Sequence, residues 1–271
     1  MRLSERLETV ASFVDKGSIV ADVGTDHGYI PVCLVERGIC PAAIGMDVRP
    51  GPLSRAREHI EERGLGDRIQ TRLGDGLEPL APGEADTAVI AGMGGELIIR
   101  ILENGRRLWG DVRTWILSPQ SEIQKVRLFL WENGFRAVDE AMVLDEGKYY
   151  TVMKCRREGA SVRPEPGLLE AEVSSPGLPE AEVSSPGLPA AEIPAAEIPA
   201  AGVPAPGELR YGRILLERRD PVLRDYLEKE LEKLSAIEGQ LGASGTEKAR
   251  ARLEEVRREI ETAKEAYDAV R

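Results

Sequence analysis

Aromatic residues make up only 4% of this 271-residue chain, which argues against an extended base-stacking platform for single-stranded nucleic acid. The three cysteines, Cys33, Cys40 and Cys155, show no metal-ligand spacing and no disulfide framework, as is usual in a reducing cytosol. No run of 18 apolar residues is present, so we expect no membrane-spanning helix. The first ten residues are charged and contain no apolar signal core. These absences predict a cytoplasmic protein that binds neither a membrane nor a metal.

The net charge of −11 is unfavourable for nucleic-acid binding, but the acidity is unevenly distributed. Residues 158–207 contain one basic and eight acidic side chains, whereas the segments on either side are nearly neutral. Residues 1–157 carry 21 basic and 24 acidic side chains, and residues 208–271 carry 14 and 15. Local basic patches therefore remain available outside the acidic segment.

The most informative stretch is 19–31, which reads as a buried strand, a glycine turn and the start of a helix. Such a unit forms a ligand-binding crevice at the carboxyl end of a parallel sheet. A dinucleotide site would need Gly-x-Gly-x-x-Gly, but the turn contains Asp22, Gly24, Asp26 and Gly28. Two carboxylates would repel a pyrophosphate. They suit a ligand with sulfonium and ammonium groups, such as S-adenosylmethionine.

Strand and helix patterns alternate along residues 1–157, which predicts a parallel sheet covered on both faces. Two further strands, 135–144 and 148–155, are joined by Asp145-Glu146-Gly147, a hairpin signal. The expected fold is therefore α/β, a Rossmann-like sheet of seven mostly parallel strands with the last strand reversed. This arrangement resembles the class I methyltransferase fold.

The rest of the chain divides into two parts. Residues 158–207 repeat a ten-residue, Pro/Ala/Glu-rich unit, which favours a flexible linker over a solenoid because so few large apolar residues are present. In residues 208–271, leucines recur three or four apart in 221–241, and the same spacing returns in 253–270. We expect an antiparallel, coiled-coil helical hairpin there. Its candidate basic stripe, alternatively an ordinary solvated face, consists of Arg250, Arg252, Arg257 and Arg258.

Two further acids follow predicted strands. Asp47 lies about twenty residues beyond the glycine turn, where an acid can bind both ribose hydroxyls; alternatively it caps the next helix. Asp75, within Gly74-Asp75-Gly76, can accept from an adenine amino group; alternatively it belongs to a plain Asp-Gly turn. Either residue taken alone leaves both interpretations open.

The glycine-rich stretch 91–95 follows the fourth strand, where an acceptor would meet a methyl donor. Three glycines there leave room for a ligand, although a helix-start turn would use the same residues. His27 has no second histidine or cysteine to pair with in a metal site, so we expect it to line the crevice. His59 is expected at the surface.

Four motifs together resemble the bacterial tRNA (adenine-22-N1)-methyltransferase family. They are the stretch from Asp22 to Pro31, Gly74-Asp-Gly-Leu77, Ile90-Ala-Gly-Met-Gly-Gly95 and Asp145-Glu-Gly-Lys-Tyr-Tyr150. The opening Leu3-Ser-Glu-Arg-Leu7 is similar as well, and the likeness resumes more loosely from Tyr211 through the helical hairpin. Ser118-Pro119-Gln120 departs from the expected Gln-Pro-Asn, and the repeat in 158–207 is not a family feature.

The resemblance implies S-adenosyl-L-methionine as cofactor, tRNA as partner, and N1 of adenine 22 as the methylated atom. It implies that Asp22, Gly24, Asp26, His27 and Gly28 line the methionine side of the cofactor. Asp47 would hold the ribose, Asp75 and Gly76 the adenine, and Ala91 and Gly92 would face the reacting centre.

Catalysis would then consist mainly of positioning, because N1 has a lone pair and needs no prior deprotonation. Asp26 and Tyr29 are the candidates for orienting an extruded base. Two alternatives remain open: a methyltransferase acting on another RNA, a protein or a small molecule, and a non-catalytic S-adenosylmethionine-binding interaction protein. The sequence does not decide which tRNAs are modified or whether the protein is a monomer.

Overall fold

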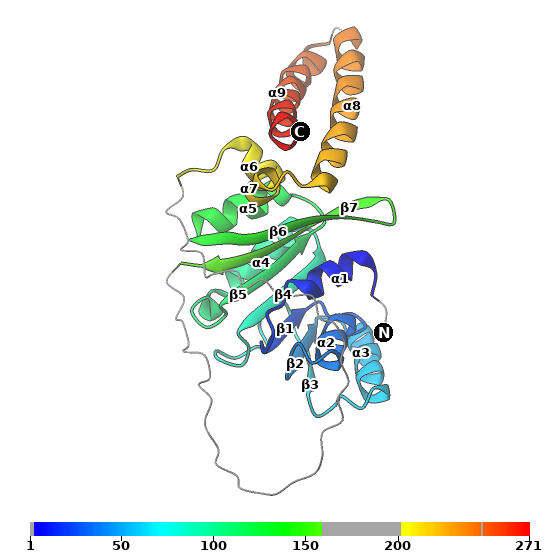
Figure 1. Cartoon of the computed structure of the whole chain (residues 1–271), viewed down its shortest axis with the longest axis vertical. Helices are drawn as coiled ribbons and strands as arrows, with labels where there is room; N and C mark the ends of the chain where they lie inside the picture. The colour runs from blue at the N-terminus through cyan, green and yellow to red at the C-terminus, as the bar shows by residue number, and fades with distance from the viewer. Residues whose placement is uncertain (1–2, 159–201, 245) are drawn as a thin grey trace, which may run out of the picture.

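The computed structural model describes residues 3–158, 202–244 and 246–271. Seven strands form one sheet in the order β3-β2-β1-β4-β5-β7-β6 (Figure 1). The strands are β1 (Val20–Val23), β2 (Ala43–Asp47), β3 (Ile69–Leu73), β4 (Thr87–Met93), β5 (Thr114–Pro119), β6 (Phe135–Asp145) and β7 (Lys148–Arg157). β7 is antiparallel to both of its neighbours, and the other pairs are parallel. The predicted fold class, with its reversed last strand, is confirmed.

Helices cover both faces of the sheet, as the alternating sequence pattern predicts. One face packs against α1 (Glu5–Ser12), α2 (Tyr29–Glu36) and α3 (Pro50–Glu62). The other packs against α4 (Gly95–Asn104), the short 3-10 helix η1 (Arg106–Leu108) and α5 (Ile123–Glu132). Strand residues alternate between the two hydrophobic cores: Val20 and Ile116 face α1 and α2, and Ala21 and Leu117 face α4 and α5.

The strand order reverses between β1 and β4, which both belong to the centre of the sheet. In open α/β sheets, ligands bind at such a switch point beyond the carboxyl ends of the strands. The loops after β1, β2, β3 and β4 carry the residues that the sequence analysis singled out. The topology therefore gathers them at the carboxyl ends of the parallel strands.

The C-terminal residues form α6 (Pro206–Tyr211), α7 (Arg213–Glu217), α8 (Pro221–Ser244) and α9 (Glu247–Val270). Helices α8 and α9 pack side by side as the predicted hairpin, and α6 and α7 join it to the sheet (Figure 1). A third hydrophobic core fills the space between these helices, with Met142 of β6 packed against it. Most of the predicted linker, residues 159–201, lies outside the described residues.

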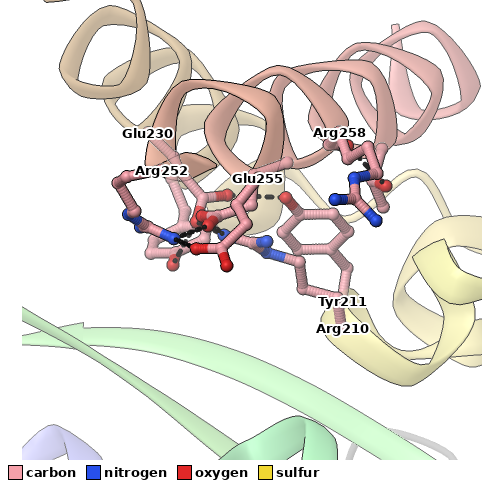
Figure 2. Close-up of polar contacts among 9 residues, drawn as sticks. Arg210, Tyr211, Glu230, Arg252, Glu255 and Arg258 are labelled. Atoms are coloured by element: carbon pink, nitrogen blue, oxygen red, sulfur yellow. Dashed lines mark hydrogen bonds and ion pairs between the residues drawn. The ribbon is translucent and has the colours of Figure 1, made fainter. Parts of the chain in front are cut away.

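Polar contacts reinforce the base of the hairpin. Arg210 of α6 reaches Glu230 at 2.9 Å and Glu259 at 3.2 Å, and the buried Tyr211 donates its hydroxyl to Glu230 at 2.7 Å (Figure 2). Because Glu230 lies on α8 and Glu259 on α9, one arginine ties both long helices to α6. The orientation of the hairpin at its base is thus set by contacts within the chain.

Candidate active site

Strand β1 carries a carboxylate into the interior at the carboxyl edge of the sheet. All four residues of β1 are buried, and Asp22 is only 4% exposed. Burial raises the pKa of the Asp22 carboxyl to about 6; the nearby Thr25 hydroxyl opposes the shift and the charge of Asp47 adds to it. No lysine, arginine or histidine pairs with Asp22 within the described ranges. A cationic ligand at this position would therefore relieve an unfavourable buried charge.

The turn after β1 adopts a left-handed backbone at three alternate positions. The φ angles are 71° at Gly24, 49° at Asp26 and 72° at Gly28. Aspartate is among the few residues that tolerate this region, and its side chain at position 26 is 57% exposed toward the crevice mouth. The turn therefore presents a second, solvent-accessible carboxylate beyond the buried one.

The two glycines of this turn have different surroundings. A Cβ at Gly28 would lie 3.3 Å from the Cβ of Ala56, so this glycine allows α2 to approach α3. A Cβ at Gly24 would meet the methyl group of Met93, which brings the turn after β1 against the end of β4. Gly24 therefore lies between the turn after β1 and the end of β4, whereas Gly28 lies on the side of the turn that packs against α3.

Asp47, at the end of β2, is 5% exposed and bridges two loops. Its carboxylate accepts a hydrogen bond from the backbone N–H of Arg49 at 2.9 Å and one from that of Asp26 at 3.4 Å. The residue at the N-cap of α3 is Arg49, so the alternative role of Asp47 as that cap is wrong. An ionised carboxylate has about four acceptor sites, which leaves capacity for two ribose hydroxyls.

The loop after β3 lies against the end of β2, because Gly74 N–H donates to the carbonyl of Asp47 at 3.0 Å. Asp75 is exposed, and its own carbonyl accepts from Glu78 N–H at 3.1 Å, so the expected Asp-Gly turn is present. Gly76 has φ 58°, and a Cβ there would approach Ile101 of α4 to 3.0 Å. The turn role occupies only the backbone of Asp75, and its side chain is exposed to solvent.

At the end of β4 the ladder to β5 is interrupted by a bulge between Ala91 and Met93. Gly92 occupies the bulge with φ 80°. The atoms nearest to a Cβ there would be Arg6 Nη1 at 3.4 Å and Gln120 Nε2 at 3.9 Å. Two side-chain donors, one of them from the N-terminal helix, therefore lie within 4 Å of where a Cβ at Gly92 would stand.

Aromatic rings form one wall of the crevice. Tyr29, which is 41% exposed, stacks on His27 with ring centroids 5.3 Å apart and meets the edge of His59 at 5.5 Å. His59 Nδ1 lies 3.1 Å from the carbonyl oxygen of His27. His59 is therefore half-buried against this turn and not fully at the surface, and only the packing of α3 on the loop shows that.

Two residues of the crevice were missed from the sequence. Arg6 lies over the bulge of β4, and its guanidinium carbon lies 5.2 Å from the ring centroid of Tyr150. Both belong to motifs that carried the family resemblance, but a charged residue in a first helix is ordinarily solvated. The motifs therefore contained both residues, but no local sequence pattern indicated that Arg6 and Tyr150 would lie near the bulge of β4.

Cation and metal chemistry find little support elsewhere in the described part of the chain. No group of three His, Cys, Asp or Glu side chains there could hold a metal ion. None of its helices is long and apolar enough to cross a bilayer. A groove of about 540 Å³ lies between α5, β6 and α6–α7, but it is remote from the strand ends that carry the predicted residues.

These features together fit S-adenosylmethionine. The candidate acceptors are two buried carboxylates on adjacent strands, Asp22 and Asp47, and two exposed ones, Asp26 and Asp75. The profile of the family described as "Methyltransferase domain" matches residues 3–153, more than half of the chain. The fold and the crevice thus define a Rossmann-like methyltransferase.

Characterised relatives narrow this class. The chain is 40% identical over 154 residues to the tRNA (adenine(22)-N(1))-methyltransferase of Bacillus subtilis; the match covers 56% of this chain and 64% of that protein. It superposes on the crystal structure of the B. subtilis M1A22 tRNA methyltransferase TrmK with a TM-score of 0.76 and 28% identity, over 98% of this chain and 99% of that one. The chain belongs to the tRNA (adenine(22)-N(1))-methyltransferase family.

A second structure is similar over its full length. Streptococcus pneumoniae Sp1610, provisionally assigned as a tRNA (m1A22) methyltransferase, is 30% identical, with a TM-score of 0.75 over 98% of this chain and 100% of that one. The same protein in complex with S-adenosyl-L-methionine superposes with a TM-score of 0.72. The sequence matches to curated proteins cover little more than the sheet domain. The structural matches also include the helical hairpin.

Proposed function

We propose that this protein transfers the methyl group of S-adenosyl-L-methionine to N1 of adenine 22 in tRNA. The observation that carries the proposal is the pair of buried carboxylates, Asp22 and Asp47, on neighbouring strands and next to glycine turns with a left-handed backbone. The B. subtilis relative and the S-adenosyl-L-methionine complex of Sp1610 support the choice of acceptor and donor. When bound, the donor supplies an electrophilic methyl group on a sulfonium.

The proposed roles follow the geometry. Asp22 and Asp26 make the field around the turn after β1 negative, which favours the cationic part of the donor. Asp47 would accept from the ribose, and Asp75 with Gly76 would border the adenine. His27, Gly24 and Gly28 shape the methionine side, and Ala91 and Gly92 leave the approach to the reacting centre open.

Asp26 and Tyr29 are proposed to orient the acceptor base. Tyr29 offers an exposed ring at the crevice wall, and base–aromatic stacking is worth about 1 to 3 kcal/mol per base. Transfer to N1 leaves a positive charge on the adenine ring. A carboxylate fixed at the crevice mouth stabilises that developing charge, so Asp26 acts without accepting a proton.

The hairpin formed by α8 and α9 is proposed to contact the tRNA body, as part of a C-terminal unit covering residues 208–271. Its candidate arginines are largely engaged: Arg252 pairs with Glu255 at 2.8 Å, and Arg257 with Glu238 at 3.0 Å (Figure 2 shows the first pair). These pairs weaken the case for a free basic stripe. The hairpin would therefore act more by shape than by charge.

The test is methyl transfer from labelled S-adenosyl-L-methionine to an unmodified tRNA, with adenine 22 and with guanine 22 in parallel. Label on the first tRNA alone is the expected result. Equal label on both would reject the position, and no label on either, with donor binding intact, would reject tRNA as the acceptor. Calorimetric titration with S-adenosylhomocysteine supplies the donor-binding control.

The role of Asp26 is tested with Asp26→Asn, because asparagine also tolerates the positive φ at this position. We expect kcat to fall at least tenfold, by about the 1.4 kcal/mol or more that a lost charge interaction with the transition state costs. The matched control is Asp67→Asn, which removes an exposed carboxylate just before β3, at the opposite edge of the sheet. Full turnover by the Asp26 variant would remove this residue from the mechanism.

A further inference from the structure

The guanidinium of Arg6 lies at the rim of the crevice, over the bulge of β4. Its Nη1 is the atom nearest to where a Cβ at Gly92 would stand, at 3.4 Å, and Gln120 Nε2 is next at 3.9 Å. Gln120 is held there because its backbone N–H donates to the carbonyl of Met93 at 2.8 Å. Two side chains that can donate hydrogen bonds, from α1 and from the loop after β5, therefore converge on one point of the proposed acceptor side.

The position of Arg6 is set by its backbone and leaves the guanidinium free to bind. Its N–H donates to Asp145 at 3.2 Å, which ties the first turn of α1 to the hairpin between β6 and β7. Val10 and Ala11 bury the other end of the helix against the sheet. The face of Tyr150 lies beside the guanidinium, 5.2 Å from ring centroid to Cζ, and restricts its rotamers.

The charge of Arg6 is uncompensated locally. Throughout the described ranges, no carboxylate lies within ion-pair distance of its guanidinium, whereas Arg127, Arg210 and Arg252 are each paired. Arg6 is partly buried, so water solvates it incompletely. A preorganised, partly desolvated arginine is suited to an anionic oxygen pair, such as that of a phosphodiester.

A second polar group at this point also lacks a partner. Ser118 is 1% exposed, and its hydroxyl makes no hydrogen bond within the described residues. Strand alternation places it on the same face as Ile116, the face that α1 covers, and it pairs in register with Ala91. A buried hydroxyl without a partner costs stability, so Ser118 is an unsatisfied polar group paired in register with Ala91, next to the bulge.

The reaction itself distinguishes a phosphate from the base as the ligand of Arg6. N1-methylation makes the adenine ring cationic, so an arginine against the ring edge would oppose the transition state. An arginine on the nucleotide's phosphate would hold the extruded residue without that penalty and would offset the negative backbone charge.

We propose that Arg6 binds a backbone phosphate of the acceptor nucleotide, with Tyr150 holding the guanidinium in place and Gln120 supplying a second donor beside it. This inference rests on the proposed tRNA methyltransferase function and adds a positioning residue to it. Arg6 holds the acceptor strand while the residues of the opposite wall orient the base.

The test compares Arg6→Gln with the wild type in tRNA methylation across a range of salt concentrations. We expect kcat/KM for tRNA to fall about tenfold to a hundredfold, the loss typical of one charge-assisted contact, mainly through KM. The dependence of log kcat/KM on log salt concentration should become shallower by about one, because one phosphate contact is lost. Affinity for S-adenosylhomocysteine and the thermal midpoint should stay at wild-type values, because the hydrogen bond to Asp145 comes from the backbone.

The matched control is Arg113→Gln. Arg113 pairs with Asp86 at 3.6 Å just before β5, at the opposite edge of the sheet, and its loss should leave the salt dependence unchanged. Arg6→Lys should keep the salt slope of the wild type yet lose part of the affinity, since an ammonium cannot bridge two oxygens. This variant also carries the test if Arg6→Gln does not fold.

The outcomes separate cleanly. An Arg6→Gln protein with unchanged KM and salt slope, or one that loses donor affinity in parallel with tRNA, would overturn the phosphate contact. If the wild type methylates tRNA and the Arg6→Gln protein behaves in either of these ways, the methyltransferase function stands and only the phosphate contact is overturned. A wild type that methylates no tRNA overturns the proposed function, and the inference with it.

Discussion

Two buried carboxylates in this chain have opposite surroundings. Glu140 of β6 is 3% exposed and accepts from Arg127 Nε at 3.1 Å, from Arg127 Nη2 at 3.0 Å and from Ile214 N–H at 3.1 Å. Asp22 of β1 is 4% exposed and has no cation beside it in the described structure. Glu140 is satisfied by the chain itself, whereas Asp22 is buried without a cationic partner in the described residues.

The glycines of the two regions differ in the same way. Gly212 lies in the junction, by which we mean the contact of Arg127 and Glu140 with the C-terminal helices. A Cβ at Gly212 would lie 2.6 Å from Glu140 Oε2 and 2.7 Å from Arg127 Nη2. A Cβ at Gly92, in the crevice, would meet nothing closer than 3.4 Å. Both have a left-handed backbone, with φ 98° and 80°. Polar groups are packed closely around Gly212, whereas the polar groups near Gly92 lie at ordinary contact distance.

The largest effect is expected from breaking the junction. Arg127→Ala leaves Glu140 charged and unpaired in the interior and should cost about 3 to 5 kcal/mol of unfolding free energy. Arg127 also donates to the carbonyls of Arg210 at 2.9 Å and Tyr211 at 3.3 Å, so the C-terminal helices should loosen. Denaturant unfolding measures the first effect, and limited proteolysis measures the second.

The control for this prediction comes from the same junction. Arg213 and Glu217 form an exposed pair at 3.2 Å, and Arg213→Ala should change stability by less than about 0.5 kcal/mol. The double variant Arg127→Met with Glu140→Leu should be more stable than Arg127→Ala, because no buried charge is left alone. A double variant as unstable as the single one would contradict this account of Glu140.

Removing the charge of Asp22 should stabilise the protein, in contrast to the loss of Arg127. Its pKa is raised from 3.8 to about 6 in the folded protein, so the folded state binds the proton more tightly than the unfolded state. The charged form therefore costs stability above pH 6, and the cost disappears as the pH falls toward the unfolded value. Asp22→Asn should be about 2 to 3 kcal/mol more stable than the wild type at pH 7.5, and the difference should shrink by about 1 to 2 kcal/mol at pH 5.

The Asp22→Asn variant should change stability and ligand binding in opposite directions. The same Asp22→Asn protein should bind S-adenosylhomocysteine more weakly than the wild type does. Asp67→Asn, on the surface, should change neither quantity. If Asp22→Asn were less stable than the wild type at every pH, Asp22 would be satisfied within the chain like Glu140, and the contrast between the two regions would fail.

The smallest expected effect on stability comes from Gly92→Ala. A left-handed alanine costs about 1 kcal/mol, and the neighbouring guanidinium must move by a few tenths of an ångström. Gly38→Ala is the matched control, with φ 64° and no atom within 4 Å of the new methyl group. Both variants should lose similar stability in thermal unfolding. Only Gly92→Ala should lose methyl transfer, by tenfold or more, and equal activity of the two would place the acceptor away from this bulge.

Several parts of the fold and site were predictable because they depend on local patterns. Alternating strand and helix signals predicted the layered sheet, and the Asp-Gly hairpin signal predicted the reversed β7. The order of strand, glycine turn and helix placed Asp22 and Asp26, and spacing placed Asp47. These features repeat over a few residues, so neighbouring side chains are enough to reveal them.

Contacts between distant segments could not be predicted in this way. Arg6 meets Gly92 because α1 packs across the sheet, and Arg127 donates to the carbonyls of residues 209–211, which follow the whole segment 158–207 in the chain. The arginines of α9 read as a basic stripe, but the register of α8 against α9 pairs Arg257 with Glu238. A sequence shows which side chains carry charge, and packing decides which charges neutralise one another.

The sequence by itself determined the class of fold, the edge of the sheet that holds the crevice and the carboxylates at its strand ends, since periodicity and turn chemistry act locally. The tertiary structure alone decided which buried carboxylate is satisfied and which is open, and which arginine faces the acceptor side. The reason is physical: desolvation and pairing depend on every group within a few ångströms, and most of those groups come from remote parts of the chain.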